Sequence, residues 1–441
     1  MHTDITRGRR GRRTAARYAA GLTALAALGG CASGPADATL VRAARATPRQ
    51  TAPVADQRAA AAATTAFGAD LYHALAAGAA GHGNLALAPS GLADAMGMLL
   101  PGARGTTASQ IASVLHTSLP AQRFAVALGT LEQGELTRAT GDKATLRESD
   151  ALWTQSGYGI QQPYLRTLAA AFGTGAHTVD FASDPGAARH TIDDTVSDET
   201  DGAVKDLFPS DALTRDTRFA LTDAVYFDAK WQQPFDHDAD SRAPFHLLGG
   251  STADVRMMNH AGEYGYAQGS GWQAVELPYR GGDFAMDLIV PDSGGFTRFA
   301  SGLTADQLTS VLGGLKSRPM MLSMPGFGFD SGEALGTTLA GLGMPAALDP
   351  GRADFGGIPT RASDRLHVQS VVQKTRITVN DTGTTAAAGS GITGGAGAAP
   401  APGRPVVVDR PFLFVIRDLH SDGPGGSGRI LFLGQVTDPR G

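Results

Sequence analysis

Apolar residues recur at helical spacing in the part of the chain that follows residue 63. They return every four positions from Phe67 to Leu75, which predicts an amphipathic helix. Pro89 is expected to open a second helix over residues 90–100, whose leucines and methionines share one face. The segment Thr107–Gln110, TASQ, has a capping-box pattern and predicts the start of a third helix.

Strand patterns dominate the second half of the chain. Runs of β-branched and aromatic residues occupy 219–227, 284–290, 366–379, 411–417 and 429–436. The last two runs flank a Gly/Ser/Asp-rich segment, which predicts a buried hairpin. Helices followed by strands with few crossover helices predict an α+β fold with mostly antiparallel sheets. No interdomain linker is recognisable after residue 63, so we expect a single domain over 63–441.

Residues 380–404, NDTGTTAAAGSGITGGAGAAPAPGR, break this pattern between two predicted strands. A structureless segment of this length inside a compact domain is usually functional or disordered. Its first half, TTAAAG at 384–389, carries neither bulk nor charge, so as a strand it could slide between two others with few clashes. A dispensable surface insertion is the alternative interpretation.

The composition narrows the possible classes of function. The 441 residues are 42% hydrophobic and 18% charged, which suffices for a large core and excludes disorder throughout. A net charge of −5 gives no basic surface for nucleic acid. A single cysteine excludes an internal disulfide framework and a multi-cysteine metal site. We find no G-x-S-x-G, S-x-x-K, H-E-x-x-H or Walker motif, and the histidines lack ligand spacing. We therefore expect neither an enzyme nor a cofactor or metal site.

The N-terminus has the pattern of an export signal over residues 1–30. An arginine-rich start precedes a short apolar run, which is too short for a permanent membrane span. The run ends in Leu-Gly-Gly-Cys31, which resembles the bacterial lipoprotein cleavage box and predicts lipid attachment at Cys31. Ordinary secretion is the alternative. Residues 31–62 lack aromatic residues and hydrophobic periodicity, so we expect a flexible tether there.

Removal of the signal would change the charge of the exported protein. Residues 1–30 carry six arginines and one aspartate, so their loss takes the net charge from −5 to −10. Such a chain has no electrostatic attraction to an anionic membrane surface, and attachment would depend on the lipid. We expect an extracellular protein that is lipid-anchored to the outer face of the cell membrane.

Four stretches, in this order and spacing, resemble landmarks of the serpin family. They are 84–115, 221–260, the pair 276–279 with 288–291, and the pair 409–414 with 432–436. The resemblance covers the chain from about residue 64 to Pro439. It implies an α+β fold of one serpin domain, with three mostly antiparallel sheets and eight or nine helices. It also implies a metastable central sheet and an exposed reactive-centre loop at about 381–405.

The resemblance implies a suicide-substrate inhibitor of serine endopeptidases, and some family members trap cysteine proteases. The protease attacks a bait bond in the loop and forms an acyl-enzyme. The cleaved loop then enters the central sheet as an extra strand and distorts the trapped protease. The inhibitor itself supplies no catalytic residue and needs no cofactor. A monomer is expected.

The family's inhibitory hinge maps onto small residues in this chain. The hinge residues are Asp381, Gly383, Thr384, Thr385, Ala386, Ala387 and Ala388. Small side chains at a hinge favour insertion and therefore inhibition. The following glycines lower strand stability and slow insertion, which would turn an inhibitor into a cleaved substrate. A non-inhibitory serpin acting as a binding or carrier protein at the cell surface is therefore the alternative function.

Two counts locate the bait bond differently. Counting from Asp381 by the family's spacing gives Gly397, whereas counting back from Pro411 gives a position nearer Pro400. The sheet fixes the inserted length, so the hinge-side count is preferred. The candidates are Gly397, Ala398 and Ala399. Small bait residues suit elastase-like or subtilisin-like proteases.

The region that opens the central sheet departs from the family pattern. Asp223 stands where an asparagine is usual, and Gln373 replaces a usual histidine. A buried aspartate is costly unless it is hydrogen-bonded, and the Gln373 amide can donate to it. We therefore hypothesise that Asp223 and Gln373 bond to each other and latch the sheet; two unrelated changes are the alternative. Trp231 is expected to be a core residue near the site where the loop enters.

Overall fold

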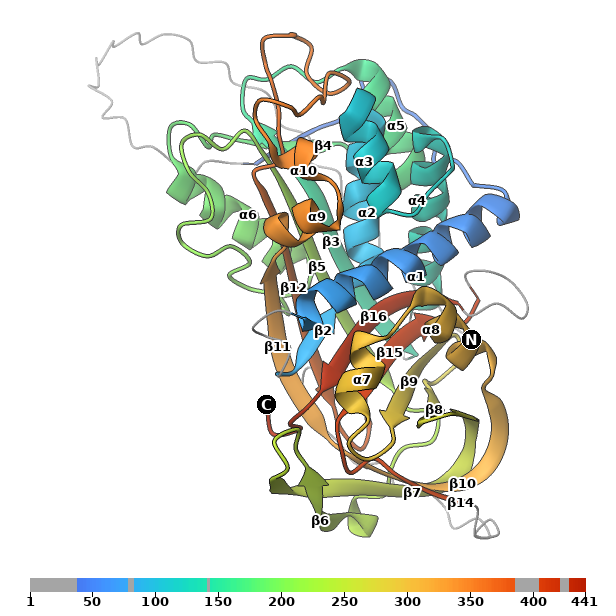
Figure 1. The fold of residues 1–441 in the computed structure, drawn as a ribbon. Helices are drawn as coiled ribbons and strands as arrows, with labels where there is room; N and C mark the ends of the chain where they lie inside the picture. Colours follow the sequence, from blue (N-terminus) through green and yellow to red (C-terminus); the bar gives the residue numbers. More distant parts are fainter. Residues whose placement is uncertain (1–37, 78–82, 141–142, 385–403, 421–427) are drawn as a thin grey trace, which may run out of the picture. The chain divides into compact units, whose positions relative to one another are not determined.

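A computed structural model describes residues 38–77, 83–140, 143–384, 404–420 and 428–441 (Figure 1). These residues form two hydrogen-bonded sheets and ten α-helices. The helices are α1 Val54–Ala76, α2 Pro89–Leu99, α3 Gly105–Val114, α4 Ala121–Arg138, α5 Gln162–Phe172, α6 Pro185–Glu199, α7 Phe296–Ser301, α8 Ala305–Gly313, α9 Gly336–Leu342 and α10 Pro345–Leu348. The count exceeds the expected eight or nine because short helices such as α10 contribute.

Sheet A has seven strands in the order β1-β4-β3-β5-β13-β12-β11. In that order they are Thr39–Val41, Ala176–Val179, Ala144–Gln155, Phe219–Lys230, Gly383–Thr384, Ser370–Val379 and Phe327–Ala334. Most of its pairs are antiparallel, but β3–β4 and β5–β12 are parallel. Because β5 neighbours β12 and β13, sheet A joins strands that lie far apart in the sequence.

Sheet B has nine strands, with the order β14-β10-β7-β8-β9-β15-β16-β2 and β6 beside β7. In that order, with β6 last, they are Arg404–Val407, Lys316–Pro325, Thr252–Gly269, Trp272–Pro278, Phe284–Pro291, Phe412–Asp418, Arg429–Val436, Leu85–Leu87 and Ser241–His246. The long strand β7 pairs with β6 and β10 along most of its length and with β8 at its end. The expected third sheet is therefore continuous with the second.

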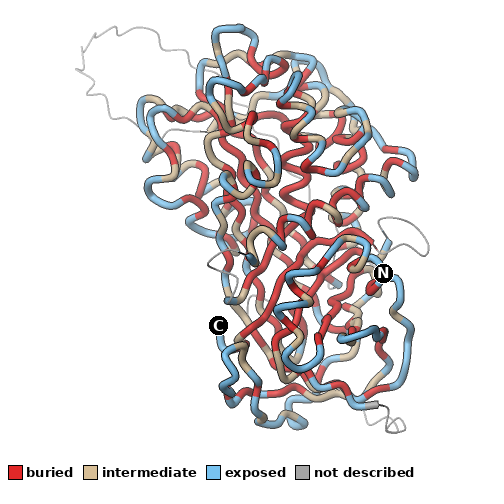
Figure 2. Tube along the Cα trace, in the orientation of Figure 1, coloured by how far each residue is buried: buried red, intermediate tan, exposed pale blue. Residues whose placement is uncertain are grey.

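Strand β5 is buried on both faces, because helices cover sheet A from two sides (Figures 1 and 2). Leu221 faces the core under α2, whereas Ala220 and Ala224 pack in the cluster that contains Ile192 of α6. Such two-sided burial explains why FALTDAVYF lacks a polar alternation. The predicted hairpin is confirmed, since β15 and β16 pair antiparallel and are buried throughout.

The expected tether over 31–62 is wrong from residue 39 onwards. Thr39–Val41 pairs antiparallel with β4, and α1 already begins at Val54. Ala60 and Ala61 are buried in the core. Alanine side chains are small enough to pack closely between helices. An alanine-rich segment can therefore form a buried helix although it lacks aromatic residues and a clear hydrophobic periodicity. The folded region therefore begins before the expected boundary at residue 63.

The capping-box prediction at Thr107 is also wrong, because α3 begins at Gly105. The Thr107 hydroxyl instead accepts a hydrogen bond from the Asp354 backbone N–H (3.0 Å). Gln110 Oε1 accepts one from the Ala346 N–H (2.9 Å). These side chains attach the segment around α10 to α3. Within the described ranges, no helix has both the length and the apolar composition that a membrane span requires.

Arg429 of β16 joins sheet B to two helices through a buried ion network. Its guanidinium donates to Asp94 of α2 (2.7 Å) and to Glu135 of α4 (3.0 Å), and all three side chains are fully buried. Removing one member of a buried ion pair leaves an uncompensated charge. The network therefore fixes the packing of α2 and α4 on sheet B.

Replacing Arg429 by Met should lower the free energy of unfolding by about 3–5 kcal/mol, because Asp94 and Glu135 lose their cation. Urea denaturation measures the change. Arg440→Ala is the matched control, since Arg440 pairs with Asp438 at the exposed C-terminal end and should cost under about 1 kcal/mol. Equal effects of the two substitutions would contradict the prediction.

Candidate functional site at the opening of sheet A

Strands β5 and β12 touch along only part of their length. Ala220–Val225 pairs in parallel with Ser370–Thr375, and we call this direct contact the seam. Beyond it the two strands separate, and β13 lies between them. Gly383 pairs with Lys230, and Thr384 pairs with both Ala229 and Val379. The start of the predicted hinge is therefore already a strand of sheet A.

A tight turn connects β12 to β13. The Asn380 side-chain Oδ1 accepts hydrogen bonds from the N–H groups of Thr382 (2.9 Å) and Gly383 (3.1 Å). Gly383 passes very close to β5, since a Cβ there would lie 2.1 Å from the Ala229 carbonyl oxygen. The hinge glycine is thus required by the close approach of two backbones.

Trp231 and Tyr279 form the floor beneath this turn. Trp231 is buried, and its ring stacks on Tyr279 with centroids 4.7 Å apart and planes 10° apart. Its indole N–H donates to the Asn380 carbonyl (2.8 Å), and its backbone N–H donates to Thr382 (2.9 Å). The Tyr279 hydroxyl lies 2.6 Å from the Thr384 hydroxyl. Burial raises the pKa of Tyr279, so it stays neutral.

The predicted hydrogen bond between Asp223 and Gln373 is present at the seam. Gln373 Nε2 donates to Asp223 Oδ2 and to the Ala88 carbonyl (2.8 Å), and its Oε1 accepts from the Ala88 N–H (3.0 Å). Both side chains are buried. Gln373 therefore ties β12 to β5 and to the residue that precedes α2.

Gly91 of α2 leaves room for the Asp223 carboxyl group. A Cβ on Gly91 would lie 2.3 Å from Asp223 Oδ1. Any side chain at position 91 would collide with this carboxyl group, so the glycine makes room for Asp223 at the seam.

Two further acidic residues lie beside the seam, on strand β3, which pairs with the other edge of β5. Asp150 of β3 is directly opposite Asp223 in the register, and both of its carboxyl oxygens are buried without a hydrogen-bond partner among the described residues. The carboxyl oxygens of Glu148 are buried and have no hydrogen-bond partner among the described residues. Burial raises the pKa of Asp223 to about 7 although the Gln373 bond opposes it. Burial and neighbouring carboxylates raise the pKa of Asp150 and Glu148 well above their usual range.

Sequence reasoning missed several of these residues. Glu148 and Asp150 belong to the segment RESD, whose charges suggest a solvated surface, and nothing local signals that their carboxyl oxygens are buried. No sequence pattern indicates a functional role for Tyr279 or Asn380, although Tyr279 belongs to the family landmark at 276–279. Only the three-dimensional contact with Trp231 reveals their role.

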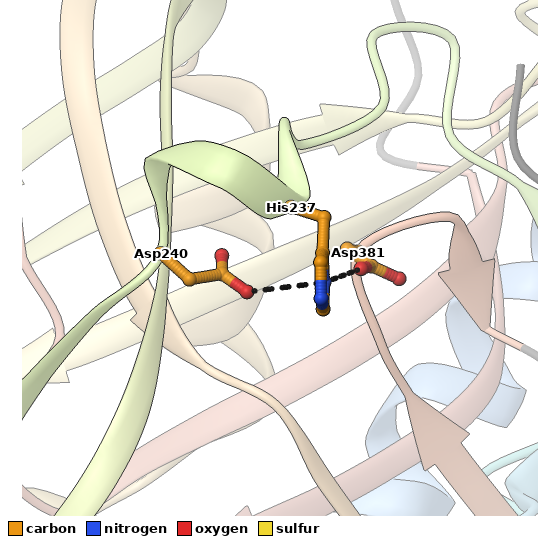
Figure 3. Close-up of side chains that lie close together, drawn as sticks. All are labelled: His237, Asp240 and Asp381. Carbon is orange, nitrogen blue, oxygen red and sulfur yellow. Dashed lines mark hydrogen bonds and ion pairs between the residues drawn. The ribbon is translucent and has the colours of Figure 1, made fainter. Parts of the chain in front are cut away.

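Asp381, the first predicted hinge residue, lies in the turn before β13, where its carboxylate points toward His237 (Figure 3). Its carbonyl accepts from the Phe235 N–H (2.9 Å). Its carboxylate contacts Arg256 Nη2 (2.9 Å) and His237 Nδ1 (3.0 Å). The structure thus brings together Asp381, Gly383, Thr384 and Trp231. The remaining predicted positions lie outside the described residues: Cys31, Thr385, Ala386, Ala387, Ala388, Gly397, Ala398 and Ala399.

Comparisons with known proteins agree with this architecture. A family model described as Serpin (serine protease inhibitor) matches residues 62–439. An uncharacterized serpin-like protein of Methanosarcina acetivorans is 30% identical over 387 residues, which cover 86% of this chain and 88% of the relative. The leukocyte elastase inhibitor of Bos taurus is 30% identical over 387 residues, covering 86% and 99%. Tengpin, a thermophilic serpin in its native state, has a TM-score of 0.79 at 20% identity, covering 91% and 100%.

The chain therefore belongs to the serpin family. The α+β fold expected from the resemblance is confirmed, with the differences in sheet and helix number described above. The family supports protease inhibition in general, a function that requires no catalytic residue of the inhibitor.

The stability of the protein should depend on pH through Asp223. Its folded-state pKa of about 7 exceeds the unfolded value of about 3.9, so protonation favours the folded state. This contribution to stability is complete below about pH 4 and is lost as the pH rises through about 7. Between about pH 4 and pH 7 the unmodified protein should therefore lose stability that Asp223→Asn retains, as urea denaturation at several pH values would measure.

Asp211→Asn is the matched control, because Asp211 is exposed. It should leave the pH dependence of stability unchanged. An unchanged pH dependence in Asp223→Asn would show that the Asp223 carboxyl group does not titrate in this range.

Proposed function

We propose that this chain is a suicide-substrate inhibitor of serine endopeptidases, which traps the acyl-enzyme by inserting its cleaved reactive loop into sheet A. The observation that carries the proposal is β13, which already lies between β5 and β12 where those strands separate. Insertion of the loop would lengthen β13 between β5 and β12 and would not change the order of the strands in sheet A.

The register of β13 indicates what further insertion would displace. Both ladders run antiparallel to β13, and continuing them residue by residue places Ser390 opposite Asp223 on one side and Gln373 on the other. Insertion to that point must separate Asp223 from Gln373 and replace the seam with two new ladders. This supports the hypothesis that the Asp223–Gln373 bond latches the sheet.

The same register supports the hinge-side count of the bait bond. Strand β5 begins at Phe219, so its ladder with an inserted strand would end opposite residue 394. Gly397, Ala398 and Ala399 begin three residues beyond that point. Their small side chains support an elastase-like or subtilisin-like target, with the protease serine attacking the carbonyl of the bait bond.

The N-terminal pattern supports export with a lipid on Cys31, so that the inhibitor works as a monomer at the outer face of the cell membrane. The shorter connection found here, with the fold beginning near Thr39, would keep the domain close to that surface. A binding or carrier protein with an inert loop is the competing function.

Mixing the protein with elastase, subtilisin and trypsin tests the proposal. We expect a complex that survives detergent on denaturing gels, together with a released C-terminal peptide whose mass places the cleaved bond within 397–399. Cleavage without a complex and without a rise in the melting temperature would mean that sheet A rejects the strand. The carrier function would then replace the inhibitory one.

Substitutions at two adjacent hinge positions separate insertion from bait recognition. By the register, residue 388 would face Val225 and Thr375 in the buried core, whereas residue 387 would face half-buried Tyr226 on the other side. Ala388→Arg should therefore be cleaved at an unchanged rate while losing most of its covalent complex, because insertion would bury a charge.

Ala387→Arg is the control and should retain the complex. Gel quantification of complex against cleaved inhibitor gives the partition for each variant. Equal partition in the two variants would contradict the register proposed for the inserted strand.

A further inference from the structure

Four side chains from three segments meet at the turn before β13, and we call them the hinge cluster: His237, Asp240, Arg256 and Asp381. His237 lies in a single 3-10 turn and Arg256 in β7. Figure 3 shows His237 lying between the carboxylates of Asp240 and Asp381. His237 Nδ1 is 3.0 Å from Asp381 Oδ2 and 3.5 Å from Asp240 Oδ2.

Arg256 is the cation of this cluster. Its Nη2 lies 2.9 Å from Asp381 Oδ2 and 2.6 Å from His237 Nδ1, and its Nε donates to Asp240. The ligand atoms of His237, Asp240 and Asp381 lie within 4.8 Å of one another, a spacing that a metal ion could use. The Arg256 guanidinium already contacts all three, so the positive charge they require is supplied from within the chain.

The cluster is more than an exposed ion pair. The Asp240 side chain is only 11% exposed, and its Oδ1 is buried with no hydrogen-bond partner among the described residues. Asp240 therefore depends on Arg256 for compensation of its charge. One guanidinium that binds two carboxylates and an imidazole forms a network, and networks contribute more than isolated surface pairs.

The cluster holds the turn at the place where a strand must enter. Backbone N–H groups of Trp231 and Phe235 already bind the carbonyls of Thr382 and Asp381. Arg256 adds a side-chain contact to Asp381 from β7, a strand of sheet B. The turn is thus fastened to elements that lie outside the β5–β12 pair.

We propose that Arg256 is a positioning residue, which keeps the start of the reactive loop inside sheet A by holding Asp381. Insertion then extends a strand that already exists and avoids the entropy cost of ordering its first residues. This inference rests on the proposed inhibitory function for its consequence, but the anchoring itself can be measured without any protease.

Amide hydrogen exchange at Gly383 and Thr384 tests the anchoring. Arg256→Ala should raise exchange at these two amides about fivefold relative to the unmodified protein, whereas Arg256→Lys should restore part of the protection. Arg242→Ala is the matched control, because Arg242 makes an exposed pair with Asp254 in the same sheet and does not contact Asp381. It should leave exchange at both amides unchanged.

Inhibition gives a second readout. In Arg256→Ala the fraction of inhibitor that is cleaved without trapping the protease should rise about fivefold, while the rate of initial attack on the bait bond stays the same. A purely structural defect would lower the rate of attack and the melting temperature together. Asp381→Asn, which keeps the Arg256–Asp240 pair, should reproduce the exchange result if Arg256→Ala folds poorly.

Unchanged exchange at Gly383 and Thr384 in both Arg256→Ala and Asp381→Asn would overturn the proposal. A change in wild-type exchange on adding Zn²⁺ would also overturn it, since a metal would then hold the three ligands. If the wild-type protein traps no protease but the exchange result holds, the proposed inhibitory function fails while the anchoring stands.

Discussion

The seam between β5 and β12 is the constraint on which the rest of the structure depends. Strand β5 pairs with β3 along nearly its whole length, and β12 pairs with all of β11. Between them, direct pairing covers only Ala220–Val225 and Ser370–Thr375, in the slightly weaker parallel arrangement. Sheet A therefore consists of two extensively paired sets of strands, one containing β5 and one containing β12, joined by a short contact. The buried hydrogen bond between Asp223 and Gln373 lies at that contact.

The fold was largely predictable from the sequence, because its signals are local. Two-sided burial of Phe219–Lys230 shows as a continuous apolar run, and the β15–β16 hairpin shows as two such runs around a turn. Asp223 and Gln373 could be paired in advance because the family resemblance places both positions where the sheet opens, and a buried carboxylate requires a hydrogen-bond donor.

The remaining features depend on contacts that no local pattern encodes. Glu148 and Asp150 lie in a half-buried, charged part of β3, and their carboxyl oxygens are buried because β3 packs against α2, α4 and β5. The role of Gly91 follows from a carboxyl group far along the chain. The hinge cluster joins a 3-10 turn, β7 and the loop, so its members share no spacing or motif.

The short strand β1 has a mechanical consequence. It pairs with β4, β4 pairs with β3, and β3 pairs with β5, so it belongs to one rigid half of sheet A. Tension on the chain ahead of residue 39 would therefore load the β5 half, while the β12 half, which carries the hinge turn, bears none of it directly. In a molecule held by its N-terminus, the strands from β1 to β5 would stay in place when a strand enters sheet A. The strands β12 and β11 would then make most of the movement.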